Sequence, residues 1–256
     1  MRKKTVLITV IAAIIVLIAT GIFILLPRMQ IKVFAEEYIF PFLELTPQNG
    51  GYFEDYGAEI SSGTQVQNDI FRLTLPEGYV PDDDGNYSNG EGEFAEVSSE
   101  SPELPDTLET IDLNEFYDVK LPERNDLSEA YRAVGAGGGD TVYGSLKSSV
   151  LLKKSDYSFW DIDKALAFCK LAELSEIYFI NGEEEENLVY ERGNVKGIVS
   201  INEVRRYKND GESYDTYYSV FFMFFNENDL DTPYFLNMTV SSPENAFGVL
   251  NSVEFN

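Results

Sequence analysis

Five oxygen-bearing side chains near residue 90 have the spacing of a calcium-binding loop. The residues at positions 1, 3, 5, 7 and 12 of this EF-hand-like pattern are Asp82, Asp84, Asn86, Ser88 and Glu93. The sixth position is Tyr87, where such a loop requires glycine for its turn, and the preceding segment indicates a strand rather than a helix. The pattern therefore favours a solvated acidic loop, with Ca²⁺ binding as the alternative.

A second acidic cluster, Glu183–Glu186, follows Asn181-Gly182 and is typical of a solvated turn. Paired carboxylates can hydrolyse glycosides, but a chain with 44 acidic residues forms such pairs by chance. The chain has no histidine, which excludes Ser-His-Asp and Cys-His catalysis and histidine-ligated zinc. Gly-x-Ser-x-Gly and Ser-x-x-Lys motifs are absent as well. No catalytic residue and no cofactor are predicted.

The charge is divided unevenly along the chain. All 44 acidic residues lie beyond Arg28, together with 15 of the 19 basic residues, so this outer part carries a net charge of −29. Such a surface repels nucleic-acid phosphates and anionic lipid headgroups. We therefore expect no nucleic acid to bind, and we expect a charged partner to be a basic protein or a cation. Solubility alone is the other interpretation.

The single cysteine, Cys169, lies on the apolar face of a predicted helix and is expected to be a buried thiol. One cysteine permits no internal disulfide. An extracytoplasmic domain without disulfides must be stabilised by its core, which fits a bacterial surface better than a eukaryotic secretory route.

The first 28 residues have the pattern of a membrane anchor. An uncharged run of 22 residues, Thr5–Leu26, follows Arg2, Lys3 and Lys4 and is closed by Pro27 and Arg28. As a helix the run would extend roughly 33 Å, enough to cross a hydrocarbon core of about 30 Å. The positive charges before it predict a cytoplasmic N-terminus and an extracytoplasmic remainder at the cell membrane. A cleaved signal peptide is the alternative, but the nearest small-x-small site, Val33–Ala35, lies beyond the apolar run.

Three parts follow from these boundaries. Residues 1–28 form a cytoplasmic tip and transmembrane helix, residues 29–66 a membrane-proximal segment, and residues 67–256 an outer domain with an acidic loop at 81–106. Pro41 is expected to interrupt the helix of the membrane-proximal segment. The acidic loop is either a long mobile loop or a hairpin around Glu93–Val97.

Helices are predicted in the middle of the chain and close to its end. They cover Asn125–Val134, Asp140–Leu152, a segment starting at Ser158 or Asp161, and Pro243–Leu250. Gly135–Gly139 separates the first two, and a strand over Ser148–Lys153 is the alternative for the second. The third carries an apolar stripe at helical spacing, formed by Ile162, Ala165, Leu166, Cys169 and Ala172.

Strands dominate the last third of the chain. They are predicted at Ile70–Pro76, Val195–Tyr207, Ser213–Phe225, Pro233–Val240 and Val253–Phe255, and Asn209-Asp210-Gly211 signals a hairpin. Val220–Phe225 is apolar at every position, which predicts a central strand covered on both faces. The fold class is α+β: an N-terminal transmembrane helix followed by an antiparallel sheet flanked by helices, an α/β/α sandwich-like arrangement.

Two short segments, Phe71–Tyr79 and Val249–Phe255, resemble the PsbP-like group. There a strand ends in a Leu-Pro-x-Gly-aromatic turn, matched here by Leu75-Pro76-Glu77-Gly78-Tyr79, and the region 234–255 matches a final strand, a closing helix and a last short strand. The resemblance implies an antiparallel sheet between helices and an accessory or assembly role. It supplies no catalytic residues.

These observations predict a single-pass, membrane-anchored extracytoplasmic protein that binds or assembles with another protein without catalysis. A surface module that responds to divalent cations through residues 82–93 is the second hypothesis. A carboxylate-dependent hydrolase is the third, and it would require two facing carboxylates in a cleft, one of them buried.

Overall fold

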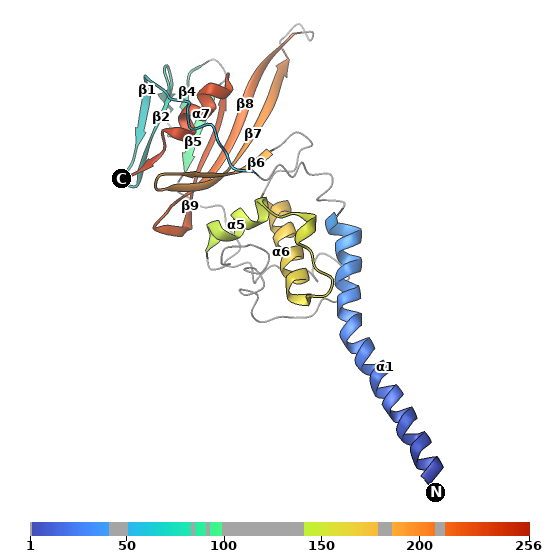
Figure 1. Cartoon of the computed structure of the whole chain (residues 1–256). Coiled ribbons are helices and arrows are strands. Elements are labelled where there is room, and N and C mark those ends of the chain that lie inside the picture. Colours follow the sequence, from blue (N-terminus) through green and yellow to red (C-terminus); the bar gives the residue numbers. More distant parts are fainter. Residues whose placement is uncertain are drawn as a thin grey trace.

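The computed structural model describes residues 2–40, 51–82, 85–90, 93–98, 141–178, 186–207 and 213–256. An apolar N-terminal helix projects from a domain that combines helices with antiparallel sheets (Figure 1). The predicted helix at Asn125–Val134, the glycine run at 135–139, the hairpin turn at 209–211 and the second half of the acidic loop, 99–106, lie outside the described residues.

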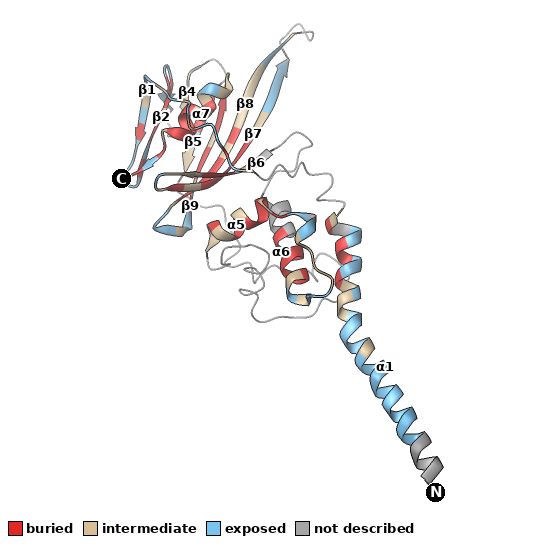
Figure 2. Cartoon of the chain, viewed as in Figure 1, coloured by how far each residue is buried: buried red, intermediate tan, exposed pale blue. Residues whose placement is uncertain are grey.

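The N-terminal helix is longer than its apolar run. Helix α1 spans Arg2–Phe34 and continues into a π-helical segment, η1, at Ala35–Ile39. Pro27 lies inside α1, so the apolar run ends there but the helix does not. The side chains from Ile8 to Leu26 are mostly exposed, whereas Ile31, Phe34, Ala35 and Ile39 are fully buried (Figure 2). Packing of this second half against the domain offsets the hydrogen bond that a proline removes.

Two antiparallel sheets form the β part of the domain. The smaller has the order β1-β2-β10, with β1 at Gly63–Gln67, β2 at Phe71–Pro76 and β10 at Glu254–Phe255. The larger has the order β3-β4-β5-β9-β8-β7-β6. Its strands are β3 (Val80–Pro81), β4 (Tyr87–Ser88), β5 (Phe94–Ser98), β6 (Glu186–Arg192), β7 (Val195–Tyr207), β8 (Tyr214–Asn226) and β9 (Asp229–Val240).

The strands predicted from the sequence are present, and the described residues contain five more, β1, β3, β4, β5 and β6. β1 and β6 were not expected, and the stretch 81–98 of the acidic loop contains the two hairpins of β3, β4 and β5. β5 pairs with β9 and so belongs to the main sheet. Of the two alternatives for residues 93–97, the hairpin is the one found.

Four helical elements other than α1 and η1 lie in the described residues: α5 (Val142–Val150), the 3₁₀ turn η3 (Lys154–Asp156), α6 (Ile162–Tyr178) and α7 (Pro243–Asn251). The strand alternative for Ser148–Lys153 is wrong, because residues up to Val150 are helical. Thr141 caps α5, where its hydroxyl accepts from the Gly144 N–H at 3.1 Å, and Ser242 caps α7 in the same way at 3.1 Å from Asn245 N.

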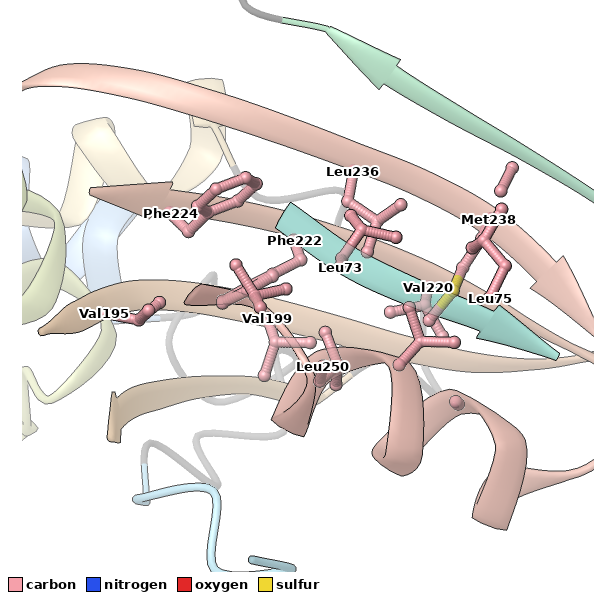
Figure 3. Close-up of a cluster of buried hydrophobic side chains, with 14 of the residues drawn as sticks. Leu73, Leu75, Val195, Val199, Val220, Phe222, Phe224, Leu236, Met238 and Leu250 are labelled. Carbon is pink, nitrogen blue, oxygen red and sulfur yellow. The ribbon is translucent and has the colours of Figure 1, made fainter. Parts of the chain in front are cut away.

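Strand β8 is central and buried on both faces, as its sequence predicts. Val220, Phe222 and Phe224 point into one cluster with α7 and β2, shown in Figure 3. Met223 and Phe225 point into the other cluster, which contains the buried residues of α5, α6 and the end of α1. The two clusters therefore lie on opposite faces of β8, one with residues of α7 and the small sheet and the other with residues of α5, α6 and the end of α1.

The thiol of Cys169 is fully buried in the α5–α6 cluster, in agreement with the prediction for this residue. Its neighbours Ala165, Leu166 and Phe168 are buried with it. Helix α6 also packs against α1 and η1, so the buried end of α1 belongs to this cluster.

Candidate functional site

The residues that have the spacing of a calcium-binding loop lie in two different turns. Asp82 lies in the β3–β4 turn, where its Oδ1 accepts the Asn86 N–H at 2.9 Å and its own N–H donates to Asn86 O at 2.7 Å. Glu93 lies after β4, at the other end of this short strand. Asp84 is outside the described residues. The structure therefore brings Asp82 and Asn86 together and places Glu93 in a separate group.

The Glu93 carboxylate is buried among partners from its own domain. It accepts hydrogen bonds from the Asn89 side-chain amide and from the Ser241 N–H. Burial and the adjacent Glu93 carboxylate raise the pKa of Tyr79, so the phenol stays protonated at neutral pH. Both carboxylate oxygens are engaged, and the described residues contain no group of three or more His, Cys, Asp or Glu side chains placed to hold a metal ion.

The second acidic cluster is only partly described. Glu186 is the first residue of β6, opposite Ile201 of β7, rather than part of a turn. The preceding residues, 183–185, lie outside the described part of the chain.

A polar cluster that the sequence did not predict joins α5, β6 and residues 52–56. Glu191 Oε1 accepts from Tyr143 Oη at 2.8 Å and from Lys147 Nζ at 2.7 Å. Tyr56 Oη donates to the Glu191 carbonyl at 3.0 Å, and the Lys147 ammonium lies 5.3 Å from the centre of the Tyr52 ring. The side chains of Lys147 and Glu191 are 29% and 30% exposed, so their charges are only partly screened by water.

The charges of this cluster are suited to stabilising the fold rather than to catalysis. Burial is the largest single influence and disfavours both ions, but the hydrogen bonds that Lys147 and Glu191 make with each other and with nearby tyrosines, together with their opposite charges, outweigh it. The pKa of Lys147 is therefore raised and the pKa of Glu191 is lowered. Burial and Glu191 also raise the pKa of Tyr143. A nucleophilic lysine needs a lowered pKa and a catalytic acid a raised one, which is the opposite of what the cluster provides.

We expect Glu191→Gln to lower the free energy of unfolding by about 1–2 kcal/mol at pH 7, since Lys147 and Tyr143 lose a charged acceptor. The pKa of Glu191 is lower in the folded chain than in the unfolded one, so its contribution is fully present above about pH 5 and is lost as the pH falls through the folded value. Chemical denaturation in mild detergent at pH 7 and near pH 3 measures both effects. The exposed Glu254→Gln is the control, and a Glu191→Gln deficit of equal size at both pH values would contradict this account.

The most distinctive surface feature is an arm formed by the ends of β7 and β8. We define the arm as residues 202–207 and 214–217, which pair with one another from Val204↔Tyr217 to Tyr207↔Tyr214. The pairing of β9 with β8 starts only at Tyr218↔Val240, and that of β6 with β7 ends at Ile201. Among the described residues the arm is therefore a two-stranded ribbon, and it projects beyond the sheet on the side away from the N-terminus (Figure 1).

Arginine and tyrosine side chains stack in pairs on the arm. The Arg205 guanidinium lies 5.3 Å from the Tyr214 ring centre, and the Arg206 guanidinium lies 5.0 Å from that of Tyr217. Neighbouring residues of a strand point to opposite faces, so each face of the arm carries one pair. Arg205 also contacts Glu203 at 3.0 Å, and its side chain is 57% exposed. Tyr214 and Val204 are exposed as well.

The arm is a local exception to the acidic character of the outer part, because Arg205 and Arg206 balance Glu203 and Asp215 within it. In the sequence, three of the 15 basic residues of the outer part stand within four positions, in Arg205-Arg206-Tyr207-Lys208. This run was the signal available in the sequence. The run lies on a projecting ribbon only because β9 and β6 do not pair along it, and the ends of those pairings cannot be predicted from the strand patterns alone.

Comparison with protein-family models, with curated proteins and with solved structures finds no match for this chain. The resemblance to the PsbP-like group therefore stays a prediction that rests on the segments 71–79 and 234–255.

Proposed function

We propose that this chain is a single-pass, membrane-anchored extracytoplasmic protein whose α+β domain binds another protein through the β7–β8 arm. The observation that carries the proposal is the pair of Arg–Tyr stacks on a projecting ribbon of an otherwise acidic domain. The sheet flanked by helices acts as the rigid platform for this arm.

The properties of α1 support the anchor. The helix is long and apolar enough to cross a bilayer, with a mean hydropathy of 3.0 over its most apolar 18-residue window, none of which is buried within the protein. One face of its last turns, with Ile31 and Phe34, is buried in the domain core, so cleavage at Val33–Ala35 would cut a helix that the fold uses. This favours an uncleaved anchor over a signal peptide. The charges of Arg2, Lys3 and Lys4 support a cytoplasmic N-terminus.

The composition of the arm supports a protein partner. Arginine and tyrosine are enriched among the residues that contribute most to protein interfaces, because each combines a large contact area with directional hydrogen bonding. The stacked pairs restrict both side chains before binding, which lowers the entropic cost of association. The net charge of −29 favours approach of a basic partner at long range, and the arm's arginines would contact carboxylate or carbonyl oxygens locally.

We expect Arg205→Ala/Tyr214→Ala to weaken association with the partner by roughly 30-fold or more, which corresponds to about 2 kcal/mol for a central interface site. The measurement is quantitative capture from intact membranes that are cross-linked before solubilisation. The matched control is Arg72→Ala, because Arg72 is also an exposed arginine in a β-strand and lies outside the arm.

Three results are informative. Loss of a reproducible partner from the arm variant alone supports the proposal. Equal recovery with the wild type, the arm variant and the control contradicts the role of the arm, and absence of any reproducible partner of the wild-type protein contradicts the binding function itself.

A further inference from the structure

The only tryptophan of the chain is exposed. Trp160 lies in the short loop between η3 and α6, and 73% of its surface is accessible to solvent. The Phe159 ring packs against it edge to face, with the ring centres 5.0 Å apart. An exposed tryptophan supported by a second aromatic ring is unusual for a surface that faces water only, because such a side chain gains most by leaving water.

This loop contacts α1 at the point where its apolar run ends. The Arg28 Nε–H donates to the Trp160 carbonyl oxygen at 3.2 Å, and the Lys32 ammonium lies 5.8 Å from the centre of the Phe159 ring. The side chains from Ile22 to Leu26 are exposed and apolar, whereas Ile31 and Phe34 are buried in the domain. Through its hydrogen bond with Arg28, Trp160 therefore lies at the boundary between the stretch of α1 suited to a bilayer and the stretch packed against protein.

We propose that the Phe159–Trp160 loop is a second membrane contact, in which Trp160 inserts into the headgroup region of the bilayer beside α1. Tryptophan prefers this region because its ring is apolar and its indole N–H can still reach water or lipid oxygens. Arg28 and Lys32 stand beside it and can pair with lipid phosphates, although Lys32 also lies 3.4 Å from Glu36 and Asp161 follows Trp160 in the chain.

A second contact restricts how the domain stands on the membrane. A single helix leaves the domain free to tilt about the point where it leaves the bilayer, whereas an inserted side chain on a neighbouring loop fixes one side of the domain. The arm lies at the end of the protein opposite the N-terminus of α1 (Figure 1). Insertion of Trp160 would therefore hold the arm away from the bilayer, toward a partner in the extracytoplasmic space.

The inference rests on the proposed membrane anchor, and one experiment separates the two. Because Trp160 is the single tryptophan, the tryptophan fluorescence of the full chain, excited selectively over tyrosine, reports this site alone. The chain is reconstituted into phosphatidylcholine vesicles made with ordinary lipid, with lipid brominated near the headgroup, or with lipid brominated near the end of the acyl chain. We expect a blue-shifted emission that loses most of its intensity with the shallow bromines and little with the deep ones.

Emission at the position of indole in water, unaffected by either bromolipid, would overturn the inference while leaving the anchor intact. Strongest quenching by the deep bromines would also overturn it, since Trp160 would then lie below the headgroups. Failure of the chain to remain with vesicles after an alkaline wash would instead overturn the proposed anchor. Phe159→Ala tests the supporting ring, and we expect it to shift the Trp160 emission toward that of indole in water.

Discussion

Replacing Phe34 by alanine should unfold this protein far more readily than replacing Phe23, although both residues lie on the same helix. Phe34 is fully buried in the α5–α6 cluster, whereas 84% of Phe23 is exposed. We expect Phe34→Ala to lower the free energy of unfolding of the domain by about 3–5 kcal/mol, from lost transfer energy and the cavity left behind. Thermal unfolding in mild detergent, followed by circular dichroism, should show no comparable shift for Phe23→Ala.

The same reasoning predicts where a soluble domain can begin. A chain starting at Met29 keeps the buried residues of α1 and η1 and should fold without the apolar run. A chain starting at Pro41 loses Ile31, Phe34 and Ile39, at a cost of roughly 5–8 kcal/mol, which is comparable to the whole stability of a typical domain. Equal melting temperatures for the two chains would show that the second half of α1 is not part of the core.

The elements with strong local patterns could be predicted from the sequence. Val220–Phe225 is apolar at every position and belongs to a central strand. The apolar stripe at Ile162, Ala165, Leu166 and Cys169 lies on a helix, α6, although its burial extends to Ala167, Phe168 and Leu171 as well. A serine before Pro243 marks the start of α7. In each case the pattern is formed by residues close together in the chain. The spacing of apolar residues, or a residue that caps a helix, is therefore enough to predict the element.

The elements that depend on distant partners could not be predicted in this way. Strand β6 begins and ends with charged residues, Glu186 and Arg192, and is a strand because seven residues pair with β7. Strand β5 stands in a polar stretch and is held by β9. The run Arg205–Lys208 is visible in the sequence, but the arm exists because β9 and β6 end before β7 and β8 do. Tertiary pairing therefore decides these features.

The second large effect concerns the contact between Gly197 of β7 and Phe222 of β8. Gly197 pairs with Phe224, and a Cβ added at Gly197 would lie 2.5 Å from the Met223 carbonyl oxygen and 2.5 Å from Cε2 of the Phe222 ring. Since Phe222 is fully buried, its ring has little room to retreat. We expect Gly197→Val to cost about 3 kcal/mol or more, and Phe222→Ala about 3–5 kcal/mol. Gly57→Ala, at an open position, is the control for a simple glycine replacement.

A double-mutant cycle tells which neighbour of Gly197 limits the substitution. If the Phe222 ring is the main obstacle, Gly197→Ala should cost less in a Phe222→Leu background, with a coupling free energy of about 0.5–3 kcal/mol measured by chemical denaturation. If the Met223 carbonyl is the main obstacle, the coupling should be close to zero, because a backbone oxygen held in the sheet cannot move when the side chain next to it shrinks. Leucine lacks the ring atom Cε2 that the added Cβ would meet, so we expect a positive coupling. Zero coupling together with a neutral Gly197→Ala would contradict the close approach of β7 and β8 at this point.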